Sequence, residues 1–309
     1  MNAGSPSSPA FIVPGGEKCG TTSLYRYLRA HPGCYVPTKD TYLFNRDAVR
    51  RLPGFRGRIY TEAEYRALFG RVSGERAPVS GEVASSYLYT HRESAPTIRD
   101  LVGDVRILIL LRNPVDRAYS NYMHYVRDMN ELRTFEDAVE QELSGGADAI
   151  PWNRHYIAMG YYADPVRTYL EHFSRVRVEL FEDMIQRFDP WIAGVYEWLG
   201  LDSAFRPPDV AALNRSGVPV NRWIQKVFFK PSPWKLKLKD LIIRAGLPED
   251  TVSGCIERLR SRNLRPVRMS EAMRRRLCRV YREDVGVLEH LTGRDLSHWL
   301  EADQRKATE

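Results

Sequence analysis

The sequence contains no long hydrophobic run. Its densest apolar stretch, Ile107–Leu111, is far shorter than the roughly 20 apolar residues that a membrane-spanning helix needs. The opening stretch, MNAGSPSSPA, also lacks the positive charge and the apolar segment of a secretory signal peptide. We therefore expect a cytoplasmic protein.

Cysteine is scarce and dispersed. The four cysteines, Cys19, Cys34, Cys255 and Cys278, form no C-x-x-C pair and have no histidine cluster beside them. This spacing argues against a zinc site, and it fits free thiols in a reducing compartment. We expect no metal site in this chain.

The charge balance shows only a small positive excess. The chain has 46 Lys and Arg against 39 Asp and Glu, and this net charge of +7 favours anionic ligands in general. The basic residues are mixed with acidic ones and are not gathered in one stripe, which argues against nucleic acid as a partner. With 43% hydrophobic residues over 309 positions, the composition is that of a globular protein with a sizeable core.

Strand and helix patterns alternate along the chain. Three short segments, AFIVPGG, VRILILLRNP and RVRVELFED, have the apolar and β-branched content of strands. Helices are predicted for TSLYRYLRAHP, TEAEYRALFG, the segment from Asn113, TFEDAVEQEL, DPVRTYLEHF, PWIAGVYEWLG and SEAMRRRLCRVYREDVGVLEHLTG, whereas SGGADA reads as a flexible loop. The alternation predicts an α/β fold with a mostly parallel sheet flanked by helices.

The domain boundaries follow from changes in this pattern. We expect a flexible Ser/Pro tail over residues 1–9, one domain over residues 10–300 and a short tail over 301–309. From about Asn214 the sequence mixes lysine with large apolar residues, so residues 214–265 are expected to be a loop and helical insertion on the core. A C-terminal helix then completes the domain.

The segment GGEKCGTTS, between the first strand and the first helix, has the form of a phosphate-binding loop. Gly15 and Gly20 match the two glycines of G-x-x-x-x-G-K-[ST], which let backbone N–H groups surround an anion at a helix N-terminus. Thr21 stands where the lysine of that motif should be, and the lysine is Lys18 instead. A nucleoside triphosphate site also needs an acidic residue for magnesium, whereas the strand predicted in VRILILLRNP ends in Arg112. We therefore expect an anion site built from protein cations and hydroxyls, without a metal.

A second candidate group lies in LLRNPVDRAYSNY. Arg112 follows a strand, and Ser120 lies about two helical turns further on if Asn113 and Pro114 begin a helix. A guanidinium and a hydroxyl at these positions can both bind a phosphate. Taken singly, each residue would more often be a surface ion pair or a solvated serine.

The two segments KCGTTSLYRYLRAHP and RNPVDRAYSNY together resemble the signature segments of sulfotransferases that use 3′-phosphoadenosine 5′-phosphosulfate (PAPS). YYADPVRTYLEHF and GRDLSHW resemble bacterial members of that family. The resemblance runs from about Phe11 to Trp299 and implies a P-loop-like fold and in-line sulfuryl transfer without magnesium. It implies that Lys18, Cys19 (through its backbone N–H), Gly20, Thr21, Thr22 and Ser23 bind the 5′-phosphosulfate, that Arg112 and Ser120 bind the 3′-phosphate, and that Tyr162 and the loop from Asn214 to Arg222 lie near the nucleotide.

Catalysis requires a cation at the leaving oxygen and a base for the acceptor. Lys18 suits the first role. HPGCYVPTKDTYLFN resembles the stretch of glycan-type sulfotransferases that carries an acidic base, which maps onto Asp40, and GEVASSYLY places Glu82 nearby. In small-molecule sulfotransferases the base is histidine, so His124 and His155 remain alternatives. Asp40 could instead cap a turn beside Lys39, and Glu82 could pair with a cation structurally.

The acceptor is less well defined by the sequence. Aromatic-rich segments suit a phenol, a sugar or a lipid-like group, and we expect a hydroxyl or amine of a carbohydrate or secondary metabolite. Residues 214–265 are expected to form part of the acceptor side, and the lysine- and aromatic-rich stretch 227–243 is compatible with peripheral membrane contact. Two other classes of function are a P-loop kinase that uses ATP and magnesium, and a non-catalytic module that binds polyanions.

Overall fold

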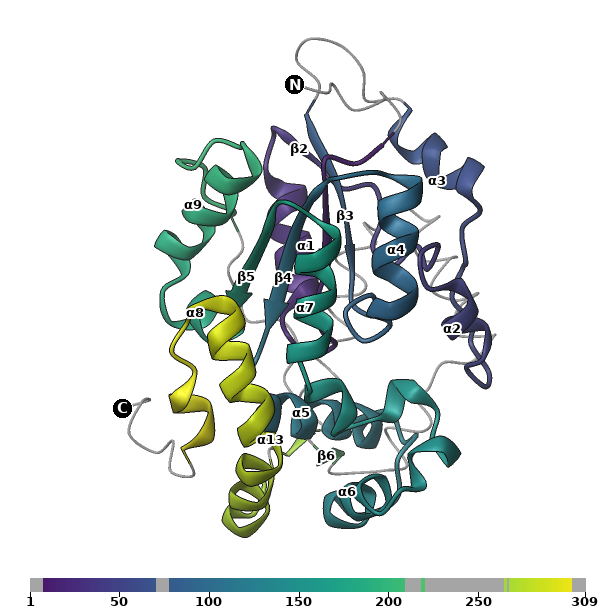
Figure 1. Cartoon of the computed structure of the whole chain (residues 1–309), viewed down its shortest axis with the longest axis vertical. Helices are drawn as coiled ribbons and strands as arrows, with labels where there is room; N and C mark the ends of the chain where they lie inside the picture. Colours follow the sequence, from purple (N-terminus) through teal and green to yellow (C-terminus); the bar gives the residue numbers. More distant parts are fainter. Residues whose placement is uncertain (1–7, 71–77, 209–217, 220–263, 266, 302–309) are drawn as a thin grey trace.

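Five short strands form the centre of the fold (Figure 1). The strands are β1 (Phe11–Pro14), β2 (Cys34–Tyr35), β3 (Val79–Ala84), β4 (Arg106–Leu111) and β5 (Val176–Leu180). They pair in the order β2-β3-β1-β4-β5, and every pairing is parallel. The predicted α/β fold with a central parallel sheet is therefore confirmed. The computed structural model describes residues 8–70, 78–208, 218–219, 264–265 and 267–301.

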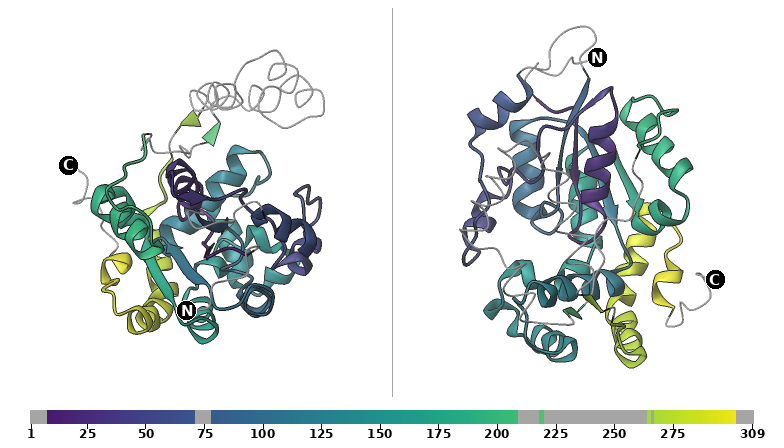
Figure 2. Two further views of the ribbon diagram at one scale, coloured as in Figure 1. Left: turned by 90° about the horizontal axis from the view of Figure 1, so that it is seen from above. Right: turned by 180° about the vertical axis from the view of Figure 1, so that it is seen from behind.

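Helices cover both faces of the sheet (Figures 1 and 2). Helices α1 (Thr21–Ala30) and α9 (Phe188–Leu199) lie on one face, and α4 (His91–Leu101) and α7 (Ala163–His172) lie on the other. Side chains of β4 alternate between the two layers, with Ile107 and Ile109 in one apolar core and Leu108 and Leu110 in the other. Because both faces of this strand are buried, its sequence is a continuous apolar run.

The other described elements extend this three-layer core. They are α2 (Arg46–Arg50), α3 (Glu62–Phe69), α5 (Pro114–Arg127), α6 (Phe135–Leu143), α8 (Phe181–Gln186) and α13 (Glu271–Thr292), the 3₁₀ turns η1 (Gly146–Ala149), η2 (Trp152–Arg154), η3 (Ala158–Gly160) and η5 (Ser297–Leu300), and the antiparallel pair β6 (Val218–Pro219) and β7 (Leu264–Arg265). The long C-terminal helix α13 packs beside α7 and α5 (Figure 1). The predicted C-terminal helical element is thus present.

Capping hydrogen bonds confirm several predicted helix starts. Thr61 and Glu64 form a complete capping box at α3. The side chain of Asn113 accepts hydrogen bonds from the backbone N–H groups of Val115 and Asp116 at the start of α5, with Pro114 at its first position. The cap at Asn113 fixes where α5 begins after β4.

Several local features differ from the sequence-based expectation, and the short elements β2, α2 and α8 were also not predicted. Helix α4 was not predicted, because Pro96 lies inside it and its N-cap Thr90 makes no side-chain capping hydrogen bond. Strand β3 was not predicted, because Gly81 and Glu82 interrupt its apolar pattern; at Gly81 a Cβ would lie 2.2 Å from the ring of Phe11 on the paired strand. Within residues 144–149, for which a flexible loop was predicted, residues 146–149 form the turn η1.

Part of the predicted organisation lies outside the described residues. Asn214, Arg222 and the segment 227–243 are among the residues whose placement is not described, as are most of the residues 214–265. Among the helices that are described, none is long and apolar enough to cross a membrane. The proposed roles of Asn214 and Arg222 therefore stay predictions from the sequence.

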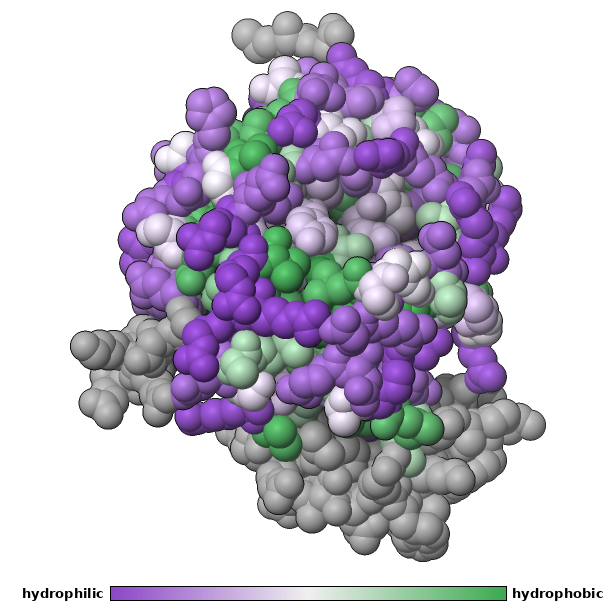
Figure 3. Space-filling view, turned by 60° about the horizontal axis from the view of Figure 1, so that its bottom comes forward, coloured by the Kyte–Doolittle hydropathy of each residue, from purple (hydrophilic) through white to green (hydrophobic). Residues whose placement is uncertain are grey.

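The face of the molecule seen in Figure 3 is largely hydrophilic. In the view from below the sheet, apolar side chains occur in small groups between hydrophilic ones (Figure 3). The large apolar side chains with substantial exposure are Leu132, Leu143, Tyr161, Leu170, Ile185 and Val267, and they belong to separate parts of the fold. Within the described residues, these side chains form no broad apolar face.

Candidate functional site

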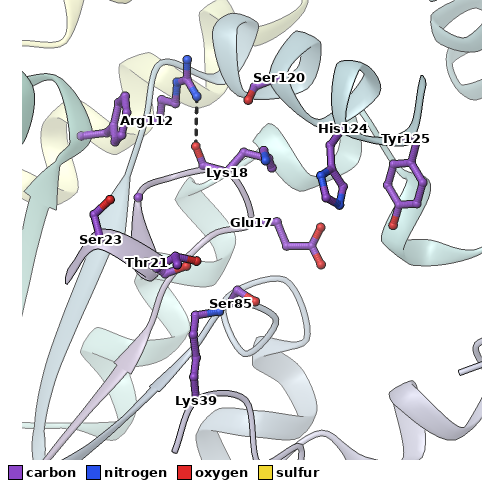
Figure 4. A pocket seen from close by; sticks show the side chains of 13 residues that line it. Glu17, Lys18, Thr21, Ser23, Lys39, Ser85, Arg112, Ser120, His124 and Tyr125 are labelled. Carbon is purple, nitrogen blue, oxygen red and sulfur yellow. Dashed lines mark hydrogen bonds between the residues drawn. The ribbon is translucent and has the colours of Figure 1, made fainter. Parts of the chain in front are cut away.

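A cavity of about 420 Å³ opens at the carboxyl ends of the parallel strands (Figure 4). In open parallel sheets ligands bind at this edge, near the point where the strand order reverses, and here β1 lies between β3 and β4. The lining residues come from the loops after β1 to β4, from the first turns of α1 and α8, and from α5: Glu17, Lys18, Gly20, Thr21, Thr22, Ser23, Lys39, Ser85, Arg112, Ser120, His124, Tyr125 and Phe181. The structure thus gathers both predicted anion-binding groups around one cavity.

The loop after β1 is held between its neighbouring strands. The N–H of Gly15 donates to the carbonyl of Ala84 at 3.0 Å, and the N–H of Gly16 donates to the carbonyl of Leu110 at 3.4 Å. A Cβ at Gly15 would lie 2.2 Å from the side chain of Thr21, so glycine is needed for this turn. Gly20, with φ of 91°, then begins α1, whose first N–H groups have no partner within the helix. The result is a cradle of N–H groups suited to an anion.

Lys18 is the cation of this cradle. Its backbone has φ of 68°, which is uncommon for a residue other than glycine, and its carbonyl accepts a 3.1 Å hydrogen bond from Nη1 of Arg112. The side chain extends into the cavity (Figure 4). Burial lowers the pKa of Lys18 to about 8, and the positive charge of Arg127 lowers it further, while Glu17 opposes the shift. An ammonium in this setting gains strongly from an anionic ligand.

Arg112 and Ser120 lie on the opposite side of Lys18 from Glu17 (Figure 4). The guanidinium of Arg112 stacks over the ring of Phe181 at 4.6 Å, which fixes its plane. Ser120 lies on α5, and both residues line the cavity, as the strand–helix spacing predicted. This pair forms a second place where an anionic group can bind.

Cys19 and Tyr162 lie beneath the loop and do not line the cavity. Cys19 is fully buried, and burial raises the pKa of its thiol to about 11, which makes it a poor nucleophile. The hydroxyl of Tyr162 is also buried and donates a 3.0 Å hydrogen bond to the carbonyl of Arg112. Tyr162 therefore holds the backbone at Arg112, directly after β4, through this hydrogen bond.

Asp40 lies at the margin of the cavity, in the loop after β2. One carboxylate oxygen accepts hydrogen bonds from the N–H and hydroxyl of Ser85 at 2.6 Å and 3.0 Å, and the other forms a 2.6 Å ion pair with Lys39. Lys39 and Ser85 line the cavity, whereas Asp40 is not among the lining residues. The alternative raised from the sequence was that Asp40 caps a turn beside Lys39; in the structure it pairs with Lys39 and accepts a hydrogen bond from the backbone N–H of Ser85.

Glu82 is buried inside the sheet and makes structural hydrogen bonds. Its Oε1 accepts from the N–H and hydroxyl of Thr41 at 3.2 Å and 2.6 Å, and from the hydroxyl of Tyr87 at 2.9 Å. Burial raises the pKa of this carboxyl. These bonds tie the loop after β2 to β3, and they direct Glu82 away from the cavity lining.

The two candidate histidines differ in position. His124 lines the cavity from α5, and its Nδ1 lies 2.9 Å from the guanidinium of Arg127. His155 lies outside the cavity lining, with Nδ1 2.7 Å from the hydroxyl of Tyr89 and Nε2 2.9 Å from the carbonyl of Ile150. His155 is therefore placed as a structural residue.

Several residues of the cavity were not predicted from the sequence, and Glu17 is the most notable of them. Glu17, Lys39, Ser85, Tyr125 and Phe181 all line it, and only Lys39 was mentioned, as a neighbour of Asp40. Burial raises the pKa of Glu17 to about 7, and the negative charge of Asp40 contributes, while the positive charge of Arg117 opposes the shift. The sequence does indicate Glu17, because it directly precedes Lys18 in the phosphate-loop motif and would therefore lie near the same ligand.

Metal-ligating side chains do not gather at this site. Across the described ranges, there is no group of three or more His, Cys, Asp or Glu side chains placed to hold a metal ion. The positively charged and hydroxyl groups described above are those available to an anionic ligand.

Comparison with known proteins gives a consistent picture. Residues 8–212 match the sulfotransferase domain family. The crystal structure of a sulfotransferase from Alicyclobacillus acidocaldarius superposes with a TM-score of 0.68 and 30% sequence identity, covering 95% of this chain and 99% of that one. The human heparan sulfate glucosamine 3-O-sulfotransferase 3A1 is 28% identical over 204 residues, which are 65% of this chain and 46% of the human protein. A mouse bifunctional heparan sulfate N-deacetylase/N-sulfotransferase 4 is 28% identical over 190 residues, and there the chain spans 21% of the relative's length.

Proposed function

This chain belongs to the sulfotransferase family, and from that premise we propose that it transfers the sulfuryl group of PAPS to a hydroxyl or amine of a carbohydrate-type acceptor. The matched region includes the loop after β1 and the whole of α5, and residues from both line the cavity. The chain spans about half the length of the human relative named above and a smaller part of the mouse relative. The acceptor is therefore proposed only for the site that this chain contains.

The observation that carries the proposal is the pair of anion-binding places in one cavity. The first is the N–H cradle with Lys18, and the second is Arg112 with Ser120. A donor with a 5′-phosphosulfate and a separate 3′-phosphate needs two such places, whereas an ordinary nucleotide needs one. The groups present are cations, hydroxyls and backbone N–H groups, which fit sulfate and phosphate oxygens.

Each residue has a role that follows from its position. The hydroxyls of Thr21, Thr22 and Ser23 and the first turn of α1 bind the 5′-end of the donor, and Arg112 and Ser120 bind its 3′-phosphate. The ammonium of Lys18 stabilises the negative charge that develops on the leaving phosphate oxygen. Cys19, Gly20 and Tyr162 shape the loop and support it.

The acceptor class follows from the relatives. The human and mouse proteins act, by their names, on heparan sulfate, and we extend this only to the class of glycan acceptors with a free hydroxyl or amine. Asp40 and His124 are the sequence-based candidates for the base that remain beside the cavity, since Glu82 and His155 are engaged elsewhere.

The proposal is tested by following the release of 3′-phosphoadenosine 5′-phosphate (PAP) from PAPS in the presence of unsulfated glucosamine-containing oligosaccharides. We expect catalytic PAP formation that persists in EDTA, because the charges that neutralise the donor are supplied by side chains. Consumption of ATP only with magnesium, with PAPS left intact, would instead establish a kinase.

A further inference from the structure

Glu17 is the one cavity-lining carboxylate in the described part of the chain. Its side chain extends into the cavity on the side away from Arg112 and Ser120, between the two loops that carry Lys39 (after β2) and Ser85 (after β3) and the helix that carries His124 and Tyr125 (Figure 4). Among the described residues, no side chain or backbone group makes a hydrogen bond or an ion pair with this carboxylate. A polar group so placed is available to a ligand.

The surroundings of Glu17 decide its chemistry. The charged and titratable groups that face it are Lys18 in its own loop, Lys39, Asp40 and Tyr42 in the loop after β2, and Arg117, His124 and Tyr125 on α5. Burial raises the pKa of Glu17 to about 7, because the protein replaces water around the carboxylate without supplying a direct partner. A base is most effective when its pKa lies near the working pH.

The other candidate bases are less available. Both oxygens of Asp40 already accept short hydrogen bonds from Ser85 or Lys39. His124 has Nδ1 against the guanidinium of Arg127. Glu82 is bound to Thr41 and Tyr87 away from the cavity. Glu17 therefore stands out among them by geometry.

We propose that the Glu17 carboxylate receives the proton of the acceptor during sulfuryl transfer. This inference rests on the proposed function. As the acceptor oxygen or nitrogen forms its bond to sulfur, its proton passes to Glu17. The bond from sulfur to the bridging phosphate oxygen breaks, and the electron pair remains on that oxygen beside Lys18. The products are the sulfated acceptor, PAP and a protonated Glu17, which returns its proton to solvent.

The pH dependence follows from two neighbouring groups. Glu17 must be ionised to accept a proton, so kcat/KM rises as the pH increases through about 7. Lys18 must be protonated, so kcat/KM falls again as the pH increases through about 8. Both limits belong to the free enzyme.

The test compares Glu17→Gln with Asp40→Asn as a matched carboxylate-to-amide control. The first measurement is the proton uptake that accompanies PAP binding at pH 7, obtained by calorimetry in two buffers of different ionisation enthalpy. PAP reproduces the product complex of the proposed step, in which Glu17 carries the proton, so the wild-type protein should take up as much as about half a proton more than Glu17→Gln does. Asp40→Asn should retain this uptake.

The second measurement is turnover of PAPS, with the oligosaccharide or with water as the acceptor. Glu17→Gln should slow PAP formation by about 10²-fold, and its kcat/KM should no longer rise as the pH increases through about 7. Its affinity for PAP should stay within threefold of wild type. Unchanged proton uptake in Glu17→Gln, or turnover near wild type, would overturn the inference and return the role to Asp40 or His124. Wild-type protein that fails to bind PAP would overturn the proposed function itself, and this inference with it.

Discussion

Replacing Lys18 by alanine should slow sulfuryl transfer by about 10³-fold at saturating donor, which is the upper range for loss of one charge-stabilising group. The reason is its position, since the side chain extends from a loop fixed by Gly15 and Gly16 into the cavity that the donor is proposed to fill. The measurement is the single-turnover rate of PAP formation. This charge matters most as the bridging bond breaks, so the rate should fall far more than the PAP affinity.

Lys39→Ala is the matched control for Lys18→Ala. Lys39 also lines the cavity, but its ammonium is paired with Asp40 at 2.6 Å. We expect a loss below tenfold for this variant. Equal losses for the two variants would show that Lys18 contributes only general positive charge, and would contradict its specific role.

Replacing Arg112 by alanine should weaken PAP binding by about 1.5–3 kcal/mol, the scale of a hydrogen bond to a charged group. This corresponds to roughly 10- to 150-fold in the dissociation constant. Arg112 is held by stacking on Phe181, and it borders Ser120 on the cavity wall. The measurement is calorimetric titration of PAP into wild type and variant.

The matched control for Arg112 is a ligand that lacks the 3′-phosphate. Arg112 also donates to the carbonyl of Lys18, so the variant could disturb the phosphate loop as well. AMP binding reports on that loop alone and should change by less than threefold. If AMP and PAP lose affinity equally, Arg112 acts through the loop and the assignment to the 3′-phosphate is wrong.

The sequence predicted those parts of the fold in which local chemistry and tertiary structure agree. The strand 106–111 is apolar on both faces because it is buried on both faces, and Asn113 with Pro114 begins a helix by a local hydrogen bond. Helix α4 and strand β3 could not be predicted in this way. In α4 tertiary packing overrides Pro96, and β3 contains Glu82, whose Oε1 accepts hydrogen bonds from Thr41 and Tyr87 inside the sheet.

Site residues that belong to a continuous sequence motif could be predicted, whereas those brought to the cavity only by the fold could not. Lys18, Thr21, Arg112 and Ser120 each belong to a continuous motif, and the structure brings them to one cavity. Phe181, Ser85 and Tyr125 reach that cavity from three separate elements, and no local pattern marks them. Glu17 was missed because its side chain looks like a loop charge until its lack of a partner and its cavity position are seen.

A thermal-shift comparison of PAP, AMP and ATP with magnesium tests the central claim most directly. A ligand that binds only the native state raises the melting temperature. At a hundredfold excess over its dissociation constant, it adds about 2.7 kcal/mol to the free energy of unfolding. We expect a clear rise in melting temperature with PAP, a much smaller one with AMP and none that depends on magnesium. A rise only with ATP and magnesium would contradict the proposal of a PAPS-binding site.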